Sequence, residues 1–494
     1  MALHQIPILT FQPQISKGHD FVRGFAVSET SRVENFDVFE ADRIRNLGSY
    51  AWDDAMVETT PERFIQFAEQ SLLPGIKEDR QSWESKKRLL CTQLYYLVAT
   101  RLSDKTIVDS LSNSSAASRK RKALWNKLKE RGWARIVLGH RKKGYLTRIY
   151  ATDELLKQLI GNESVLSHEP VLVRGSELSS QNGIPIVSGH TGKFDPHTGR
   201  HLSKEQREKP LLFPGVGDPD RTKVEMCEMT LEDINDLNRQ HIWQIRHPLG
   251  FTLNPSVTLR QIHIGAWGRS CRIYTFGPLS AQGFPREYRR TMTIDGEPTI
   301  ELDFHCMHPR MLYHSLGHDV TGDLYDWHKV FPRFASSSDG NLEKCTAVRH
   351  FLKTSLNICF HTVSRYAATE AIKKHLRTSA SFGENWLQQL MKKIEELTVP
   401  EFLNRLEQEH SHIRCRFYRN VGMDLMTHEA SIMLATLYEM ISSGRPALGI
   451  HDGLICRERD ADFAYDVMKR SYEARFPGFT PRIRRVSYEY PESP

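Results

Sequence analysis

The sequence predicts an α+β protein, in which a small, mostly helical region precedes a larger domain built around an antiparallel sheet. Apolar residues at helical spacing, followed by a predicted hairpin, occupy residues 81–160. Two later segments, 298–317 and 446–476, each carry an aspartate at the end of a predicted strand. With 494 residues, of which 39% are hydrophobic and 26% charged, the chain has the composition of a folded protein with about two to four domains.

Export and membrane insertion are not indicated by the sequence. No apolar run approaches the roughly 18 to 20 residues that a membrane-spanning helix needs. The N-terminal stretch MALHQIPILTFQPQ lacks the basic start and long apolar segment of a signal peptide. The eight cysteines are scattered without a CxxC pair, which argues against a disulfide scaffold or a zinc ribbon. We therefore expect a reduced, cytoplasmic protein without membrane contact.

The excess positive charge is concentrated in residues 118–148. This segment has twelve Lys or Arg residues and one acidic residue, Glu130, whereas the rest of the chain has 55 basic and 59 acidic residues. A charge of one sign concentrated in so short a segment points to a polyanionic partner.

The local pattern around this segment predicts a compact domain. Apolar spacing predicts a helix over 83–100 and a short helix over 104–111. One of the serines 114, 115 and 118 then caps a basic third helix, which ends at Gly132. WARIVLG, the basic turn HRKKG and YLTRIYAT predict a two-stranded hairpin. This order of elements resembles a winged helix-turn-helix.

In the winged-helix family the third helix enters the major groove and the wing contacts backbone phosphate. The resemblance therefore implies that the nucleic acid, DNA or RNA, is contacted by seven basic residues: Arg119, Lys120, Arg121, Lys122, Arg141, Lys142 and Lys143. The alternative is a solvated basic face on a small structural domain, because winged helices also mediate protein contacts.

The regions on either side of this winged-helix-like domain (81–160) are less regular. Residues 1–80 form an N-terminal region that we expect to be partly irregular. Residues 161–225, rich in Gly, Ser, Pro and His, are predicted to be an exposed linker or insertion. Residues 230–245 then predict a helix capped by Thr230.

Two segments carry the aspartates. In PTIELDFHCMHPRMLYHSLG, residues 299–304 alternate as in a strand that carries Asp303, and residues 307–316 predict a helix with Pro309 in its first turn. In the second segment, the strands ALGI and LICRE flank HDG, so Asp452 lies at a hairpin tip, and a helix begins near Asp460. Two aspartates on adjacent strand ends suit a pair of Mg²⁺ or Mn²⁺ ions, because such ions prefer oxygen ligands. Two ions about 4 Å apart can activate an attacking hydroxyl and stabilise a leaving pyrophosphate.

A third segment, residues 346–376, predicts a helix with a polar face. Arg349, Lys353, Asn357 and His361 follow one another at intervals of four residues, which drifts slowly around one face of a helix. Such a face next to two cations suits a triphosphate and its sugar or base. The alternative is a solvated surface stripe.

The order of the three segments resembles the polymerase core of the family A DNA polymerases and the single-subunit phage-type RNA polymerases. In that superfamily, motif A is a strand-end Asp followed seven residues later by Arg, as Asp303 and Arg310 are here. Motif B is a helix with Arg and, four residues on, Lys, as at 349 and 353. Motif C is His-Asp after an apolar strand, as at 451–452. The resemblance covers about residues 225–480, and a looser likeness extends to polymerase-like proteins of plasmids, phages and integrated elements.

The resemblance implies a right-hand core over residues 226–494, with an antiparallel palm sheet and helical fingers at about 318–425. Asp303 and Asp452 would bind two metal ions and act as the catalytic residues. Nucleoside triphosphate binding would fall to Arg349, Lys353, His308, Asn357 and His361. Primer or template binding would fall to His451, Arg272, Arg286, Arg290 and Arg310, of which Arg310 would support the motif A carboxylate or the adjacent backbone. DNA and nucleoside triphosphates are thus the expected partners.

Three departures from the family pattern leave sugar selectivity open. His308 stands where DNA-polymerising members usually carry a Glu that screens against the ribose 2′-hydroxyl. His361 replaces the Tyr of motif B, and Gly453 stands where a second acid often follows the motif C Asp. We find no three-carboxylate exonuclease set and expect no proofreading. A DNA polymerase is the first expectation, and an RNA polymerase or primase of the same superfamily is the alternative.

Other interpretations remain beside this one. A non-catalytic replication initiator or regulator would use the winged helix equally well. A metal phosphohydrolase of the HD type would need further His and Asp ligands on helices, whereas His451 and Asp452 lie at a predicted strand turn. Glu301 lies two residues before Asp303 on the same strand face, as a third carboxylate near the metals or, in our preferred interpretation, as the partner of a palm arginine.

Nucleic-acid binding through residues 118–148 is expected to weaken steeply with salt. Phosphate contacts release counterions, so raising the salt concentration from 50 to 200 mM should reduce affinity by about tenfold or more. Fluorescence anisotropy of a labelled duplex at several salt concentrations measures this slope. A complex whose affinity does not respond to salt would contradict the assigned role of the segment.

Overall fold

A computed structural model of the chain describes residues 48–51, 56–57, 67, 70 and most of 83–486. The gaps in this last range are 103–104, 109–115, 139–146, 161–164, 167–171, 174–185, 193–201, 204–205, 207–208, 216, 248–251, 269–270, 276–278, 337–341 and 381–384. The predictions for most of residues 1–80 and for the basic turn with Arg141, Lys142 and Lys143 therefore lie outside the described residues.

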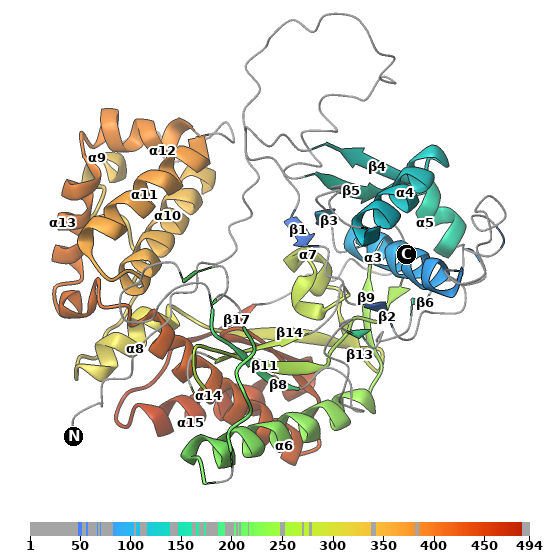
Figure 1. Ribbon diagram of the computed structural model, residues 1–494. Coiled ribbons are helices and arrows are strands. Elements are labelled where there is room, and N and C mark those ends of the chain that lie inside the picture. Colours follow the sequence, from blue (N-terminus) through green and yellow to red (C-terminus); the bar gives the residue numbers. More distant parts are fainter. Residues whose placement is uncertain are drawn as a thin grey trace, which may run out of the picture.

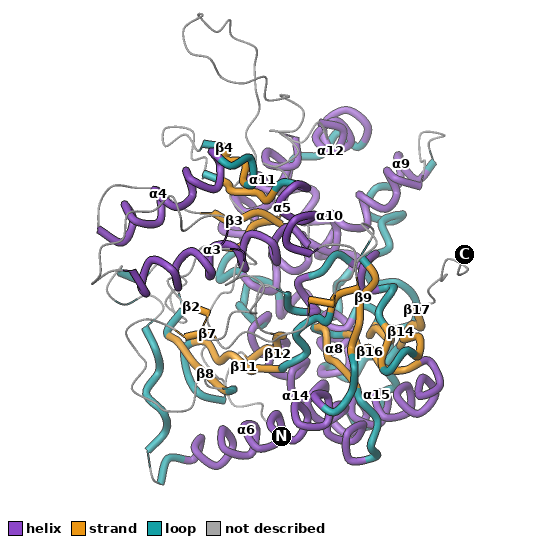
Figure 2. Tube along the Cα trace, turned by 90° about the vertical axis from the view of Figure 1, so that its right-hand side faces the viewer, coloured by secondary structure: helices purple, strands orange, loops and turns teal. Residues whose placement is uncertain are grey.

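The described chain is a mixed α/β structure with antiparallel sheets, and Figure 1 shows three groups of elements. One group contains α3–α5 with β3–β5, and another contains the helices α9–α13. The third group is a large sheet with the helices α6, α14 and α15 on one side. Figure 2 shows these three helices below the strands; α14 contacts β15 and α15 contacts β14 of the large sheet, while α6 and α14 also contact β11 and β12 of a smaller sheet.

The large sheet has the strand order β15-β16-β14-β13-β9-β10-β6, and β17 also pairs with β14. Except for β10 with β6, the pairs along this order are antiparallel. The strands are β6 (Val165–Leu166), β9 (Trp243–Arg246), β10 (Thr252–Leu253), β13 (Thr293–Ile294), β14 (Glu297–Phe304), β15 (Ala447–Ile450), β16 (Gly453–Arg457) and β17 (Ile483–Val486). The predicted strand with Asp303 and the predicted hairpin with Asp452 are both confirmed.

A smaller sheet has the order β12-β11-β8, from β8 (Val187–His190), β11 (Leu259–Ile264) and β12 (Cys271–Thr275). The predicted linker 161–225 thus contributes a strand to each of these sheets, β6 to the large one and β8 to the smaller one. It also contributes the start of α6 (Pro219–Arg239), so the helix start predicted at Thr230 is wrong. Asp218 caps the helix by accepting from the backbone N–H of Asp220, and Pro219 suits the first turn, whereas the Thr230 hydroxyl donates to the Met226 carbonyl inside the helix.

Helices cover the sheet and form the remaining parts of the core. The short helix α7 (Arg286–Arg289) contacts β9, and α8 (Met307–Ser315), which follows β14, packs against α14. The helical group consists of α9 (Pro332–Ala335), α10 (Leu342–His361), α11 (Arg365–Ala380), α12 (Asn385–Gln389) and α13 (Val399–Glu409). After them come α14 (Gly422–Ser442) and α15 (Ala461–Arg475). The single helix predicted over 346–376 is in fact two, α10 and α11, separated by residues 362–364.

The helical group has its own aromatic core. Phe331, Phe351 and Phe402 are fully buried, and the rings of Phe331 and Phe402 stack with centroids 5.6 Å apart. These residues come from the segment before α9, from α10 and from α13. Because α10 is held from behind by this core, its opposite face is free to line a site.

The region predicted as a winged-helix-like domain (81–160), called the basic domain from here on, has six described elements. They are α3 (Trp83–Leu102), β3 (Lys105–Val108), α4 (Ala116–Glu130), β4 (Ala134–Val137), β5 (Arg148–Ala151) and α5 (Asp153–Ile160). The helix predicted over 104–111 is wrong for residues 105–108, which form a strand paired with β5. Thr106, Ile107 and Val108 are consecutive β-branched residues, which favour a strand over a helix. The buried Arg148 donates to the Thr106 hydroxyl across this pairing at 2.8 Å. The hairpin of β4 and β5 and the helix α4 agree with the prediction.

None of the helices within the described ranges is long and apolar enough to cross a membrane.

Gly132 ends α4 through a left-handed turn, as predicted. Its φ is +73°, and the backbone N–H groups of Gly132 and Trp133 donate to the carbonyls of Lys129 and Leu128. A Cβ at this position would meet no atom within 4 Å, so only the backbone conformation opposes a side chain.

We expect Gly132→Ala to lower the stability of the basic domain by about 1 kcal/mol, because L residues are strained in the left-handed region. The melting temperature in thermal unfolding measures the change. Gly215→Ala is the matched control, since its Cβ also meets nothing and its φ is not positive. Equal melting temperatures for the two variants would contradict the strain argument.

Candidate functional site

A cavity of about 300 Å³ lies where the ends of β14 and the β15–β16 hairpin face α10 and α14. Its lining combines acidic, basic and apolar side chains. They are Arg272, Asp303, Phe304, Cys306, Met307, His308, Tyr325, Arg349, Lys353, Asn357, His361, Met426, Glu429, His451, Asp452 and Arg484. The three segments predicted to carry the chemistry therefore meet at one cavity.

Strand pairing brings Asp303 and Asp452 to the same place. Asp303 lies directly opposite Gly453 in the β14–β16 pair, and the backbone N–H of Phe304 donates to the Asp452 carbonyl at 3.0 Å. His451, the other residue of the hairpin tip, is in the left-handed region with φ +55°. The turn between β15 and β16 is therefore tight, and it keeps Asp452 beside the end of β14.

The two aspartates form an electrostatically unfavourable pair in the absence of a cation. Burial, the negative charge of Asp303 and that of Glu429 raise the pKa of Asp452 to about 7, while Lys353 opposes the shift. A divalent cation beside these oxygens would neutralise the excess negative charge, and carboxylates are the ligands that Mg²⁺ and Mn²⁺ prefer. The residues present thus fit a divalent cation.

The four polar residues predicted to share a face of α10 all line the cavity. Lys353 is exposed and makes no ion pair with any described residue. Asn357 is half-buried, one turn further along the helix. His361 ends α10 and packs so closely against Gly422 that a Cβ added there would overlap its ring. Burial, with the nearby His308 and Arg272, lowers the pKa of His361 to about 3, so this imidazole is neutral.

Arg349 also reaches the cavity, but Asp323 holds its guanidinium. Its Nε and Nη2 donate to the two carboxylate oxygens of Asp323 at 2.6 and 3.0 Å, and it lies 5.2 Å from the ring centre of Tyr325. Although burial opposes it, the hydrogen bonds from Arg349 and Cys306 lower the pKa of Asp323 to about 2. The pair is a bidentate one, which fixes the orientation of Arg349.

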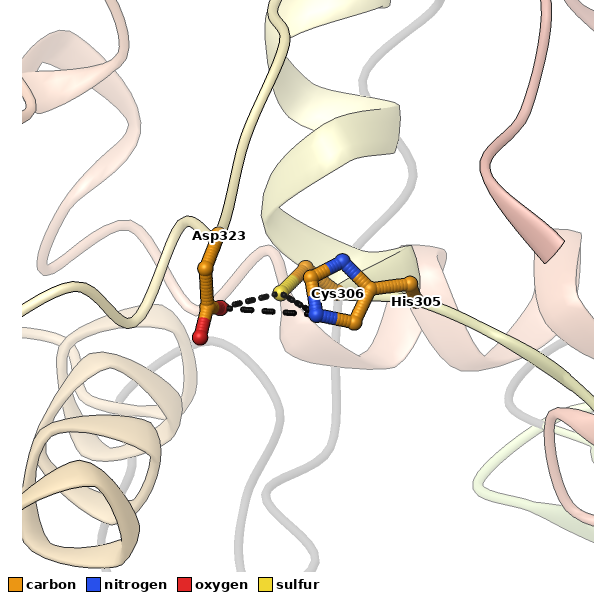
Figure 3. Close-up of side chains that lie close together, drawn as sticks. All are labelled: His305, Cys306 and Asp323. Carbon is orange, nitrogen blue, oxygen red and sulfur yellow. Dashed lines mark hydrogen bonds and ion pairs between the residues drawn. The ribbon is translucent and has the colours of Figure 1, made fainter. Parts of the chain in front are cut away.

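Figure 3 shows His305, Cys306 and Asp323 close together beside this pair. The Cys306 Sγ lies 3.1 Å from the Asp323 Oδ1, and the His305 Nε2 lies 3.6 Å from it. These three atoms are of metal-ligand type. However, Arg349 already supplies the positive charge there, and burial together with Asp323 raises the pKa of the Cys306 thiol to about 12. The group fits a support for Arg349 better than a metal centre, because a metal ligand must be a thiolate.

Glu429 is a cavity residue that the sequence analysis missed. It comes from the middle of α14, is 3% exposed, and its Oε2 lies 2.7 Å from the His308 Nε2. The Arg272 Nε lies 3.2 Å from the other oxygen. Despite its burial, Arg272 and His308 lower the pKa of Glu429 to about 2. Its one sequence signal was an acid on a helix face with the apolar residues Met426 and Met433, three positions before it and four positions after it.

Some predicted site residues lie elsewhere. Arg310 is 3% exposed, and its guanidinium donates to the backbone carbonyls of His305, Val320 and Gly322. It therefore supports the backbone after β14, as one of its two predicted roles states, and it is too buried to contact a primer or template. Arg286 and Arg290 are exposed on and after α7 and do not line the cavity.

Two further predictions concern charged residues away from the cavity. Glu301 faces Arg289 at 3.9 Å, in agreement with a partner for a palm arginine. On α4, Arg119 is exposed while Arg121 and Lys122 are half-buried, and the side chain of Lys120 lies outside the described residues. The Gln93 side chain donates to the backbone carbonyl of Arg121, which ties α4 to α3. DNA binding by α4 remains a prediction.

Comparisons with known proteins find similarity among solved structures but not among family profiles or curated sequences. No known family profile matches the sequence, and no curated protein is significantly similar to it. Among solved structures, the chain is similar to the POL domain of Pol1 from M. smegmatis in a complex with DNA primer-template and dNTP. The identity is 12% and the TM-score 0.27, over 60% of this chain and 57% of that one. The chain thus spans just over half of that domain chain, and so low a TM-score does not establish a family.

The raised pKa of Asp452 predicts a pH-dependent difference between the wild type and Asp452→Asn. Between about pH 4 and pH 7 the native state retains a proton that the unfolded chain has released, so wild-type stability falls as the pH rises. The substituted amide would remain neutral, so the variant should gain melting temperature relative to the wild type over this window, in EDTA.

Added Mg²⁺ should reduce this difference, because a bound cation favours the ionised carboxylate. Asp466→Asn, at an exposed position on α15, is the control. A difference between Asp452→Asn and the wild type that is constant from pH 4 to pH 7 would contradict the assigned electrostatics.

Proposed function

We propose that the protein is a template-directed nucleotidyltransferase of the family A polymerase type, and in the first instance a DNA polymerase without proofreading. One observation carries this proposal. Asp303 and Asp452, on adjacent strand ends, line one cavity with the polar face of α10. Two carboxylates supply sites for divalent cations, and the helix supplies cations and hydrogen-bonding groups for a triphosphate and sugar.

In the proposed reaction, the 3′-hydroxyl oxygen of a primer forms a bond to the α-phosphorus of a nucleoside triphosphate. The bond from that phosphorus to the bridging oxygen breaks, pyrophosphate leaves, and the hydroxyl proton passes to water. Divalent cations held by Asp303 and Asp452, when bound, would activate the hydroxyl and neutralise the leaving group.

The side chains of the chain itself have distinct proposed roles. Lys353, the exposed cation of α10, binds the triphosphate. Arg349, held by Asp323, presents a guanidinium of fixed orientation to the same phosphates. Asn357 and His361 contact the sugar or base, and His451 contacts the primer terminus from the hairpin tip.

His308 and Arg272 are held by Glu429, so we propose that they act as a fixed unit in the cavity of the aspartates. Gly453 and His308 stand where DNA-polymerising members of the family usually carry acids, so these positions do not select between deoxynucleotides and ribonucleotides. An RNA polymerase or primase is therefore the alternative within the same chemistry.

A non-catalytic, DNA-binding initiator is the second candidate. It is favoured by two ion pairs, Arg349 with Asp323 and Arg484 with Asp303, which engage residues that a polymerase would need. The exposed Lys353 and the unfavourable charge of Asp452 point the other way, because a purely structural site has no need for either.

Primer extension separates these candidates. A labelled primer–template is incubated with the full chain and Mg²⁺ or Mn²⁺, with deoxynucleotides and ribonucleotides in separate reactions. We expect extension with deoxynucleotides, reduced by at least about 10²-fold in Asp452→Asn and Asp303→Asn because each removes a carboxylate that binds the cations. Asp466→Asn, which removes an exposed carboxylate outside the cavity, should retain activity.

Each other outcome has a definite meaning. Extension with ribonucleotides alone, or synthesis without a primer, would assign the protein to the RNA polymerase or primase branch. Absence of product in every reaction, together with retained DNA binding, would contradict catalysis and favour the initiator.

A further inference from the structure

Arg484 places a positive charge on one of the proposed metal ligands. Its Nη2 lies 2.6 Å from the Asp303 Oδ2, and both side chains line the cavity. The two residues are directly opposite each other in the antiparallel pair of β14 and β17. The pairing of β17 with β14 therefore places the Arg484 guanidinium next to the Asp303 carboxylate.

The other basic side chains of the cavity are arranged differently. Arg272 is held by Glu429 and Arg349 by Asp323, and neither of these carboxylates is a proposed metal ligand. Lys353 makes no ion pair within the described chain. Of the cavity arginines, Arg484 is thus the one whose partner is expected to bind a cation.

The Arg484 side chain is able to leave. It is 49% exposed, whereas that of Asp303 is 20% exposed. An ion pair this exposed contributes little stability, since water screens it. A divalent cation in the cavity would instead be attracted by the carboxylates of Asp303 and Asp452 together. Displacement of the guanidinium therefore requires no repacking of the core.

We propose that Arg484 is a positioning residue that holds the Asp303 carboxylate in the metal-free protein and competes with the divalent cation for it. Arg484 thereby sets the affinity of the site for the cation. This inference rests on the proposed function, because it takes Asp303 to be a metal ligand. The inference gives a role to β17, for which the sequence analysis predicted none.

The test measures binding of Mn²⁺ alone to the full chain, by electron paramagnetic resonance of the free ion. Arg484→Gln should bind Mn²⁺ about two- to fivefold more tightly than the wild type, the range that loss of an exposed ion pair allows. Arg484→Lys keeps a competing charge and should stay near the wild-type value. Arg485→Gln removes the same charge from the next position of β17, where the side chain pairs with Asp462 instead, and should have no effect.

A bracing role for Arg484 predicts the opposite sign, because a loosened Asp303 would bind Mn²⁺ more weakly. Unchanged or weaker binding by Arg484→Gln overturns the inference. Arg484→Met, which keeps the length of the side chain, repeats the measurement, and melting temperatures close to that of Arg485→Gln verify that both variants fold.

Asp303→Asn separates this inference from the proposed function. If this variant loses Mn²⁺ binding while Arg484→Gln matches the wild type, the metal site stands and the role of Arg484 fails. If Asp303→Asn binds Mn²⁺ as the wild type does, or if the wild type binds none, the metal site and the inference both fail.

Discussion

The pairing of β14 with β16 is the interaction on which the cavity depends. Its register sets Asp303 opposite Gly453 and so brings two carboxylates, almost 150 residues apart in sequence, to one end of the sheet. A shift of one residue would turn Asp303 to the other face. The buried residues Leu302 and Leu454, opposite each other in the same pair, oppose such a shift because they would leave the core. The apolar core thereby maintains an arrangement of like charges that repel each other.

The other components of the cavity are brought to this sheet end by different means. A separate aromatic core holds α10 from behind, and the contact of His361 with Gly422 joins its end to α14. In turn, α14 contributes Glu429, which holds Arg272 and His308. Carboxylates outside the expected catalytic pair therefore orient Arg272 and Arg349, two of the four Lys and Arg side chains that line the cavity. Ion pairs of this kind hold the two guanidinium groups in place before a ligand binds.

The sequence predicted the local elements that carry Asp303, Asp452 and Lys353, because strand alternation, a tight turn and helical spacing are local signals. It also predicted that these segments share a site, although only through the resemblance of their order. Glu429 and Arg484 were missed, because an acid on an apolar helix face is a weak signal, nothing local distinguishes Arg484, and only tertiary pairing brings both to the cavity. The strand at 105–108 was mistaken for a helix although its β-branched residues favour a strand, because its partner β5 lies 40 residues further on. The break after His361 had no proline or glycine to mark it.

A residue in the left-handed backbone region lies near each proposed metal ligand, three positions after Asp303 and directly before Asp452. Cys306, with φ +54°, lies between β14 and α8, and His451, with φ +55°, precedes Asp452. Glycine adopts this conformation without strain, but it would remove a thiol and an imidazole that line the cavity. At these two positions the protein therefore has a functional side chain where the backbone conformation favours glycine. A redesign for heat resistance that placed glycine at these two positions would relieve the backbone strain but would also change the lining of the cavity.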